Sequence, residues 1–171
     1  MPLFRGTYPF LIYKINQKIN PDHAIFNTAF FALNPLVIIE SLVSSHHDIT
    51  MVFFALVGIN LFFLRKRLLA IVLVIISSQV KIPTLGLLMP IVVSYIPFKD
   101  KLDNNKFIIL SIISMFLASG YALTKIEIQP WYFIWVLPFV ALLKLNKYII
   151  SLSIGFSLGL LLRYTVLLYF G

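Results

Sequence analysis

The sequence predicts an all-α integral membrane protein with about six to seven transmembrane or re-entrant helices. Of its 171 residues, 60% are hydrophobic and only 12% are charged, and its mean hydropathy is +0.97. Soluble domains carry about 25% charged residues, so this composition excludes an ordinary soluble domain, and its apolar content also excludes a disordered chain. In a membrane protein, the net charge of +8 indicates basic cytoplasmic loops, and no nucleic-acid partner is expected.

Seven apolar runs, separated by short polar or charged breaks, form one transmembrane domain over residues 1–171. The runs cover residues 24–43, 49–64, 68–80, 84–96, 107–124, 131–143 and 148–170. A spanning helix needs about 20 apolar residues, so the longer runs predict membrane helices. The run at 131–143 is short and contains Pro138, which predicts a kink or a re-entrant segment there.

The apolar runs at 68–80 and 84–96 form either one long helix or an out-and-back hairpin. A hairpin places the basic breaks at 65–67, 97–106 and 144–147 on one face, whereas one long helix divides the basic residues evenly. The positive-inside rule therefore favours the hairpin. Each arm is about 20 Å long, shorter than a bilayer core. We expect its tip, at residues 81–83, to be recessed in a protein-covered or wet cavity.

On this topology, polar residues from three breaks lie on the extracytoplasmic side. They are residues 44–48, the hairpin tip, and residues 125–132. Arg163, well into the last apolar run, lies near the same interface. The sequence thus predicts a multi-pass protein of the cell membrane with a site that faces away from the cytoplasm.

The acidic candidates in this region are Glu40 and Asp48. Glu40 is flanked by aliphatic residues, so a solvated helix face does not explain it, and a functional role is favoured. Asp48 ends a Ser45-His46-His47-Asp48 run that fits a helix capping box. His46 and His47 with Asp48 are alternative metal ligands, although neighbouring residues at a helix start point apart.

Cations and aromatic residues complete the candidate set. Lys81 and Arg163 are suited to binding a lipid phosphate, and the alternative is that they extend to the headgroup region. Gln129, Trp131 and Tyr132 either form an interfacial aromatic belt or stack on and hydrogen-bond a sugar.

The same segments carry a family resemblance. Residues 34–40, 46–48, 80–83 and 129–138, in this order and spacing, resemble the multi-spanning GT-C glycosyltransferases that use polyprenyl-phosphate sugars, particularly the bacterial mannosyltransferase-like group. His47 departs from that pattern, because the family commonly has Asn there. The acidic motif that GT-C enzymes carry in their first extracytoplasmic loop has no match. The chain therefore resembles the C-terminal part of such an enzyme, a fragment or split protein without the N-terminal helices and first loop.

The resemblance implies transfer of a hexosyl, specifically mannosyl, group from a polyprenyl-phosphate donor to an extracytoplasmic acceptor. Glu40 and Asp48 are the catalytic candidates, with a base outside this chain as the alternative. The substrate-binding candidates are His46, His47, Lys81, Gln129, Trp131, Tyr132 and Arg163. No cofactor is certain, and a divalent metal is left open. The alternative functions are a transporter with a polar intramembrane path, and a non-catalytic subunit whose partner chain supplies the N-terminal helices.

Overall fold

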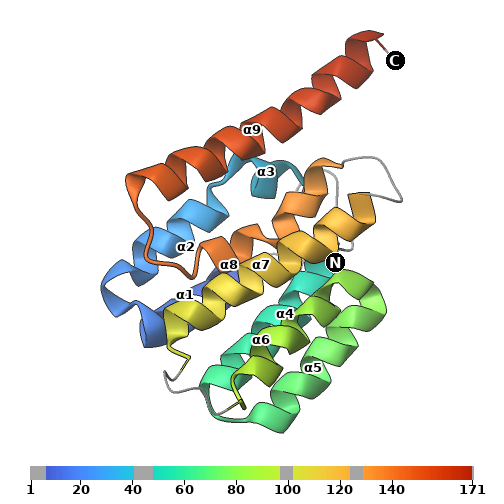
Figure 1. Ribbon diagram of the computed structural model, residues 1–171. Coiled ribbons are helices and arrows are strands. Elements are labelled where there is room, and N and C mark those ends of the chain that lie inside the picture. Colours follow the sequence, from blue (N-terminus) through green and yellow to red (C-terminus); the bar gives the residue numbers. More distant parts are fainter. Residues whose placement is uncertain (1–6, 41–47, 97–101, 124–128, 171) are drawn as a thin grey trace.

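The fold is described from a computed structural model that covers residues 7–40, 48–96, 102–123 and 129–170. All regular elements in these residues are helical, as Figure 1 shows. In chain order they are α1 (Thr7–Ile19), η1 (Pro21–His23), α2 (Ala24–Ala32), α3 (Pro35–Ile38), α4 (Asp48–Phe63), α5 (Arg67–Val80), η3 (Ile82–Leu87), α6 (Leu88–Val93), α7 (Asn104–Leu123), η4 (Pro130–Trp135), α8 (Leu137–Val140) and α9 (Lys147–Phe170). The predicted all-α class is confirmed.

Four of the predicted apolar runs form single helices, namely α4, α5, α7 and α9. Within the described ranges, however, no helix combines the length and the apolar character that crossing a membrane requires. The membrane-spanning part of the predicted fold class therefore stays a prediction.

Proline divides two of the predicted runs. The expectation of one helix over 24–43 is wrong, because α2 ends at Ala32 and α3 begins at Pro35. Asn34 caps α3, and its side-chain oxygen accepts a hydrogen bond from the Leu36 amide at 3.0 Å. Proline has no amide hydrogen and disfavours helical conformation in the residue before it, which explains the break. The run at 131–143 is likewise divided into η4 and α8, as Pro138 predicts.

The hairpin predicted between residues 68 and 96 is confirmed. α5 ends before Lys81, and η3 and α6 lead the chain back. The Arg67 guanidinium, at the start of α5, lies 4.8 Å from the centroid of the Tyr95 ring, which follows α6. In Figure 1, α4, α5 and α6 lie together, α7 crosses beside them, and α9 lies on the far side of α7.

The segment formed by η4 and α8 runs through the interior of the bundle, and its side chains at residues 132–142 are buried. Three asparagine amides bind the carbonyl oxygens at the end of this segment. Asn16 donates to Ala141 at 3.0 Å, Asn20 to Leu142 at 2.8 Å and Asn27 to Leu143 at 2.9 Å. Because unpaired carbonyls are costly away from water, these contacts hold α1 and α2 against the buried segment.

Candidate functional site

An ion pair between Lys81 and Asp48 forms the centre of the candidate site. Asp48 is the first residue of α4, and Lys81 follows the last residue of α5. Because these two helices are antiparallel neighbours, the start of one and the end of the other meet at the same end of the bundle. The Asp48 side chain is only 2% exposed, whereas that of Lys81 is 40% exposed. The buried carboxylate is thus neutralised by a cation that solvent or a ligand can reach.

Buried hydroxyl groups hold the hairpin tip against α4. Ser77 Oγ lies 2.7 Å from the Met51 carbonyl oxygen and 3.0 Å from Thr84 Oγ1. Thr84 also donates to the Lys81 carbonyl at 3.3 Å. η3 then packs closely on α7 at Gly86, where an added Cβ would lie 3.1 Å from a backbone oxygen of α7. The position of Lys81 is therefore set by contacts on both sides of the tip.

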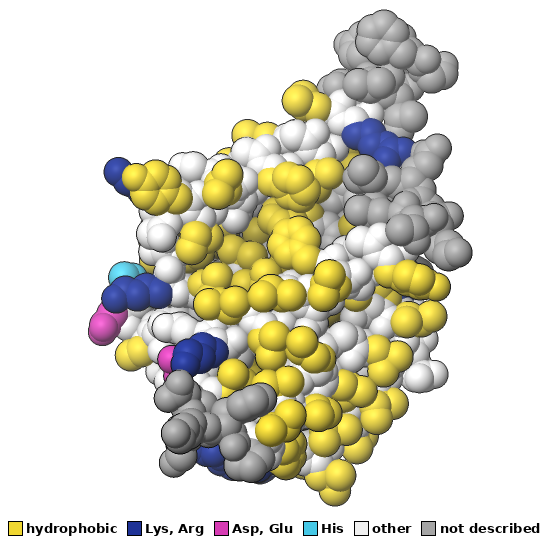
Figure 2. Space-filling view, in the orientation of Figure 1, with side chains coloured by type: hydrophobic (Ala, Val, Ile, Leu, Met, Phe, Trp, Pro, Cys, Tyr) yellow, Lys and Arg dark blue, Asp and Glu magenta, His cyan; other side chains and the backbone are white. Residues whose placement is uncertain are grey.

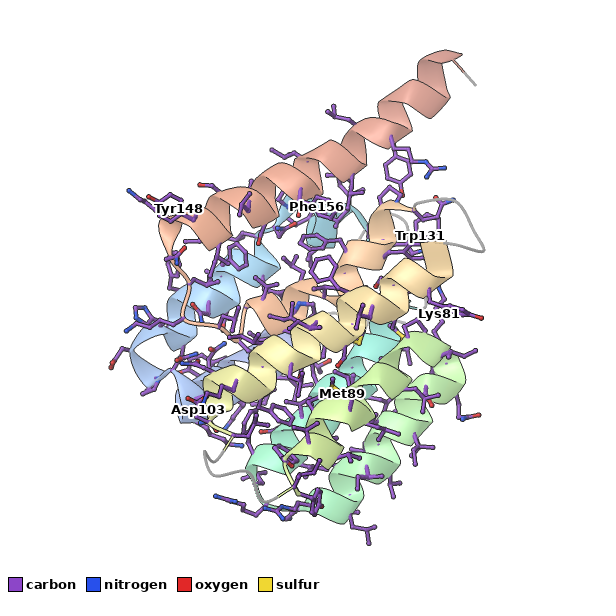
Figure 3. All side chains as sticks on the ribbon, in the orientation of Figure 1. Lys81, Met89, Asp103, Trp131, Tyr148 and Phe156 are labelled. Atoms are coloured by element: carbon purple, nitrogen blue, oxygen red, sulfur yellow. The ribbon has the colours of Figure 1, made fainter. Side chains whose placement is uncertain are left out.

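Aromatic side chains of η4 cover the ion pair. In a 3-10 helix, residues i and i+3 lie on the same face, so Tyr132 and Trp135 are neighbours, with ring centroids 4.6 Å apart. The Lys81 ammonium lies 5.4 Å from the centroid of the Trp135 ring, a geometry that favours a cation–π interaction. η4 also packs against α4, the helix that begins at Asp48. Lys81 and Trp131 lie at the same end of the bundle in Figure 3.

Two buried polar atoms at this centre have unused hydrogen-bonding capacity. Asp48 Oδ2 and Trp135 Nε1 are both buried, and neither has a hydrogen-bond partner among the described residues. Buried polar groups are normally paired. A carboxylate oxygen accepts and an indole N–H donates, so the centre offers one acceptor and one donor to a bound molecule.

The second predicted carboxylate, Glu40, lies at a different contact. It follows α3, is fully buried, and accepts a 2.5 Å hydrogen bond from the Tyr164 hydroxyl in α9. Arg163 is the neighbouring residue in α9 and is half-buried. α3 packs against both α9 and η4, so η4 lies between this contact and the ion pair.

Gln129 lines a cavity of about 190 Å³ between α7, η4 and α9, together with Tyr132. A larger groove of about 730 Å³ lies between α7 and α9. The two spaces share Phe116, Phe133 and Phe156 as lining residues. Figure 2 shows hydrophobic side chains in the hollow between α9 and α7, and Figure 3 places Phe156 there. Tyr132 therefore contributes to both the ion-pair centre and an apolar path that leads away from it.

The structure brings together three of the sequence-predicted site residues, Asp48, Lys81 and Tyr132. It places Gln129 with Tyr132 in the lining of the 190 Å³ cavity and puts Glu40 at the α3–α9 contact. His46 and His47 lie outside the described residues. Within the described ranges, no three His, Cys, Asp or Glu side chains gather as a metal site would require, and the alternative of a site with His46 and His47 stays a prediction.

Sequence reasoning did not select Trp135 and Tyr164 as site residues. For Trp135, the available signal was its spacing of three residues from Tyr132, in a segment that begins with Pro130. We find no comparable signal for Tyr164, because its contact with Glu40 depends on how α9 packs against α3.

The family comparison bears on the matched half of the chain. Residues 10–97 match the sequence profile described as alpha-(1->6)-mannopyranosyltransferase, N-terminal domain, and this range includes Asp48 and Lys81. Comparison with curated proteins and with solved structures found no match. Since the profile represents an N-terminal domain, it does not support the predicted resemblance to a C-terminal part. It does support a glycosyltransferase of the mannosyl type, and the chain belongs to the alpha-(1->6)-mannopyranosyltransferase family.

Proposed function

We propose that this protein transfers a mannosyl group from a polyprenyl-phosphate donor at the Asp48–Lys81 centre. One observation carries the proposal: a buried carboxylate is paired with a half-exposed lysine under an aromatic wall. This arrangement supplies a cation for the donor phosphate, a base for the acceptor hydroxyl and a ring surface for the sugar.

The ion pair allows Lys81 to exchange Asp48 for the donor phosphate as its anionic partner. A phosphate that enters the site competes with Asp48 for the Lys81 ammonium, which carries three N–H donors. As Lys81 turns towards the phosphate, Asp48 loses its neutralising partner and becomes a stronger acceptor. The carboxylate then takes the proton of the acceptor hydroxyl as the hydroxyl oxygen bonds to the anomeric carbon of the sugar. The bond between that carbon and the phosphate oxygen breaks, and the polyprenyl phosphate leaves with its negative charge next to Lys81.

Trp135 and Tyr132 supply the sugar contacts. Aromatic rings present an apolar face, and the indole N–H of Trp135, which has no hydrogen-bond partner among the described residues, is available to donate to a sugar hydroxyl. Gln129 and Trp131, at the other end of the same segment, are the nearest further candidates for sugar contacts.

The groove between α7 and α9 suits the polyprenyl chain. It is apolar, has about 730 Å³ of space, and reaches Tyr132 through the adjoining cavity. A long isoprenoid needs such a surface for many weak apolar contacts.

The surface of the bundle supports a location in the cell membrane. Large apolar side chains are widely exposed, among them Ile25 at 76%, Leu68 at 75% and Leu152 at 73%. Figure 2 shows such side chains over the middle of the face, with most Lys and Arg side chains at its left edge. In Figure 3, Asp103 and Tyr148 lie at that edge, and Lys81 and Trp131 lie at the opposite end. With the basic end in the cytoplasm, the candidate site faces the extracytoplasmic side.

The test is mannosyl transfer from radiolabelled polyprenyl-phosphate mannose in membranes that contain the protein, with donor binding measured in parallel. Asp48→Asn should lower transfer about 10²- to 10⁴-fold, the usual contribution of a general base, with donor binding retained. Lys81→Met should weaken donor binding about ten- to a hundredfold. Lys144→Met, at an exposed lysine on the opposite end, is the matched control and should change neither.

Two outcomes would overturn the assignment. Transfer that survives Asp48→Asn but is lost in Glu40→Gln would move the base to Glu40. Donor binding by the unmodified protein without any transfer would place the base outside this chain.

A further inference from the structure

A second cavity, of about 630 Å³, lies where the α4–α5 turn meets the end of α6 and the start of α7. Since Lys81 and this turn lie at opposite ends of α5, the cavity is separate from the proposed transfer site. Three of its lining residues are the cations Lys18, Arg65 and Arg67, and no acidic residue is among the described residues that line it. We call it the basic cavity.

Arg65 has an unusual backbone conformation at the mouth of this cavity. Its φ is 64°, and no other described non-glycine residue has a positive φ. The Arg65 amide donates to the Phe62 carbonyl, and the Lys66 amide to the Leu61 carbonyl, both at 3.0 Å. These two bonds define a Schellman motif, in which the left-handed position is usually Gly. An arginine here is strained relative to glycine, so helix termination alone does not explain the side chain at this position.

The other two cations are held in place by neighbouring groups. The Arg67 guanidinium stacks on the Tyr95 ring at 4.8 Å, and Lys18 donates to Asn60 Oδ1 at 2.5 Å. Neither contact neutralises a positive charge. Among the described residues, no carboxylate forms an ion pair with any of the three cations. In this respect the basic cavity differs from the Asp48–Lys81 centre, where the lysine already has an anionic partner.

We infer that the basic cavity binds a phosphate ester group, with Arg65 and Arg67 as the main ligands. Guanidinium groups match phosphate oxygens in a bidentate geometry, and a cavity whose described lining residues include three cations and no acidic side chain favours an anionic group. Part of the lining is apolar, including Phe62, Ile96 and Leu102. The bound phosphate therefore belongs to an anionic phospholipid headgroup whose chains pass over these side chains, or to a free phosphate compound.

The test measures binding of fluorescent phosphatidylglycerol to the purified protein in detergent micelles, with fluorescent phosphatidylcholine as the zwitterionic comparison. Arg65→Gly should lower the affinity for phosphatidylglycerol by about tenfold or more. The same change should raise the melting temperature by about 2 to 4 °C, because glycine relieves the left-handed strain. Reduced binding by a protein that is at least as stable cannot be attributed to unfolding.

Lys66→Gln is the matched control, because Lys66 is an exposed cation in the same turn but is not a lining residue of the cavity. Lys66→Gln should change the affinity for the anionic phospholipid by less than about threefold. Equal losses of affinity in Arg65→Gly and Lys66→Gln would overturn the proposal, because they would show that general surface charge and not the cavity attracts the anionic lipid. Equal affinity for phosphatidylglycerol and phosphatidylcholine would also overturn it.

A competition arm distinguishes the two phosphate sources. If millimolar inorganic phosphate displaces phosphatidylglycerol from the protein, the cavity accepts a free phosphate. If it does not, while Arg65→Gly still weakens binding, the ligand is the lipid headgroup. Mannosyl transfer is a separate readout, so failure of this inference leaves the proposed transfer function intact.

Discussion

Lys81 neutralises Asp48 across the end of an antiparallel helix pair. One member of this ion pair is buried at the start of α4, and the other is half-exposed after α5. The pair therefore serves the stability of the bundle and also leaves a cation within reach of a ligand.

The ion pair predicts a specific pattern of stability. Lys81→Met leaves the buried Asp48 carboxylate without its cation and should lower the free energy of unfolding by about 3 kcal/mol. The double variant Asp48→Asn/Lys81→Met removes both charges, and it should lower the free energy of unfolding by clearly less than Lys81→Met alone. Urea unfolding of the detergent-solubilised protein measures both, with Lys144→Met as the control. Equal losses in the single and double variants would contradict the prediction.

The hydrogen bond between Tyr164 and Glu40 predicts that the Tyr164 hydroxyl stabilises the contact between α3 and α9. Tyr164→Phe removes the hydroxyl that donates to the buried carboxylate at 2.5 Å. We expect a loss of about 1.5 to 3 kcal/mol in the free energy of unfolding, the usual range for a hydrogen bond to a charged group. Tyr148→Phe, at a 67% exposed position of the same helix, should be neutral. A neutral Tyr164→Phe would show that Glu40 does not depend on this bond.

The apolar groove predicts selectivity for the length of the donor lipid. Gly155 lines the groove, and an added Cβ there meets no atom within 4 Å. Gly155→Phe should fill the space and raise KM for a long-chain donor at least tenfold, because two buried methylenes already contribute about 1.6 kcal/mol. A donor with a short chain should be affected much less.

Gly159 provides the control for this experiment. It lies one helical turn further along α9, an added Cβ there is equally unobstructed, and it is not a lining residue of the groove. Gly159→Phe should leave both donors unaffected. If the two glycine variants behave alike, the lipid chain does not occupy the groove.

The asparagine contacts predict a strong stability effect far from the candidate site. Asn16 is fully buried, donates to the Ile12 and Ala141 carbonyls, and accepts from Asn27. Asn16→Leu should lower the free energy of unfolding by about 2 to 4 kcal/mol, because it leaves buried polar groups unpaired. Urea unfolding measures the change. Asn105→Leu, at an exposed position, should leave the free energy of unfolding nearly unchanged. Similar losses in Asn16→Leu and Asn105→Leu would argue against a stabilising role of the Asn16 contacts.

The proposed membrane orientation predicts accessibility from outside the cell. The chain contains no Cys, so single cysteines can be labelled without a background signal. Ile82→Cys, at a 73% exposed position of the hairpin tip, should react with an impermeant maleimide on intact cells. Lys66→Cys and Asn104→Cys should react only after lysis. If Asn104→Cys is labelled on intact cells and Ile82→Cys is not, the proposed orientation is wrong.

The sequence alone determined the helical class and most positions where helices begin, end and turn. α4, α5, α7 and α9 follow apolar runs bounded by charged breaks, and the hairpin tip at Lys81 followed from the distribution of basic residues. Such features depend on residues close together in the chain, which is why they are readable without a structure. The run at 24–43 is an exception, because the Asn34-Pro35 break divides it into α2 and α3.

Only the tertiary structure decided which side chains meet. The sequence offered Glu40 and Asp48 as catalytic candidates of the same region, but the structure pairs Asp48 with Lys81 and Glu40 with Tyr164. The rotation and separation of packed helices set these contacts, and both depend on the whole core. For the same reason, neither the asparagine contacts with residues 141–143 nor the left-handed Arg65 followed from the pattern of apolar and charged residues.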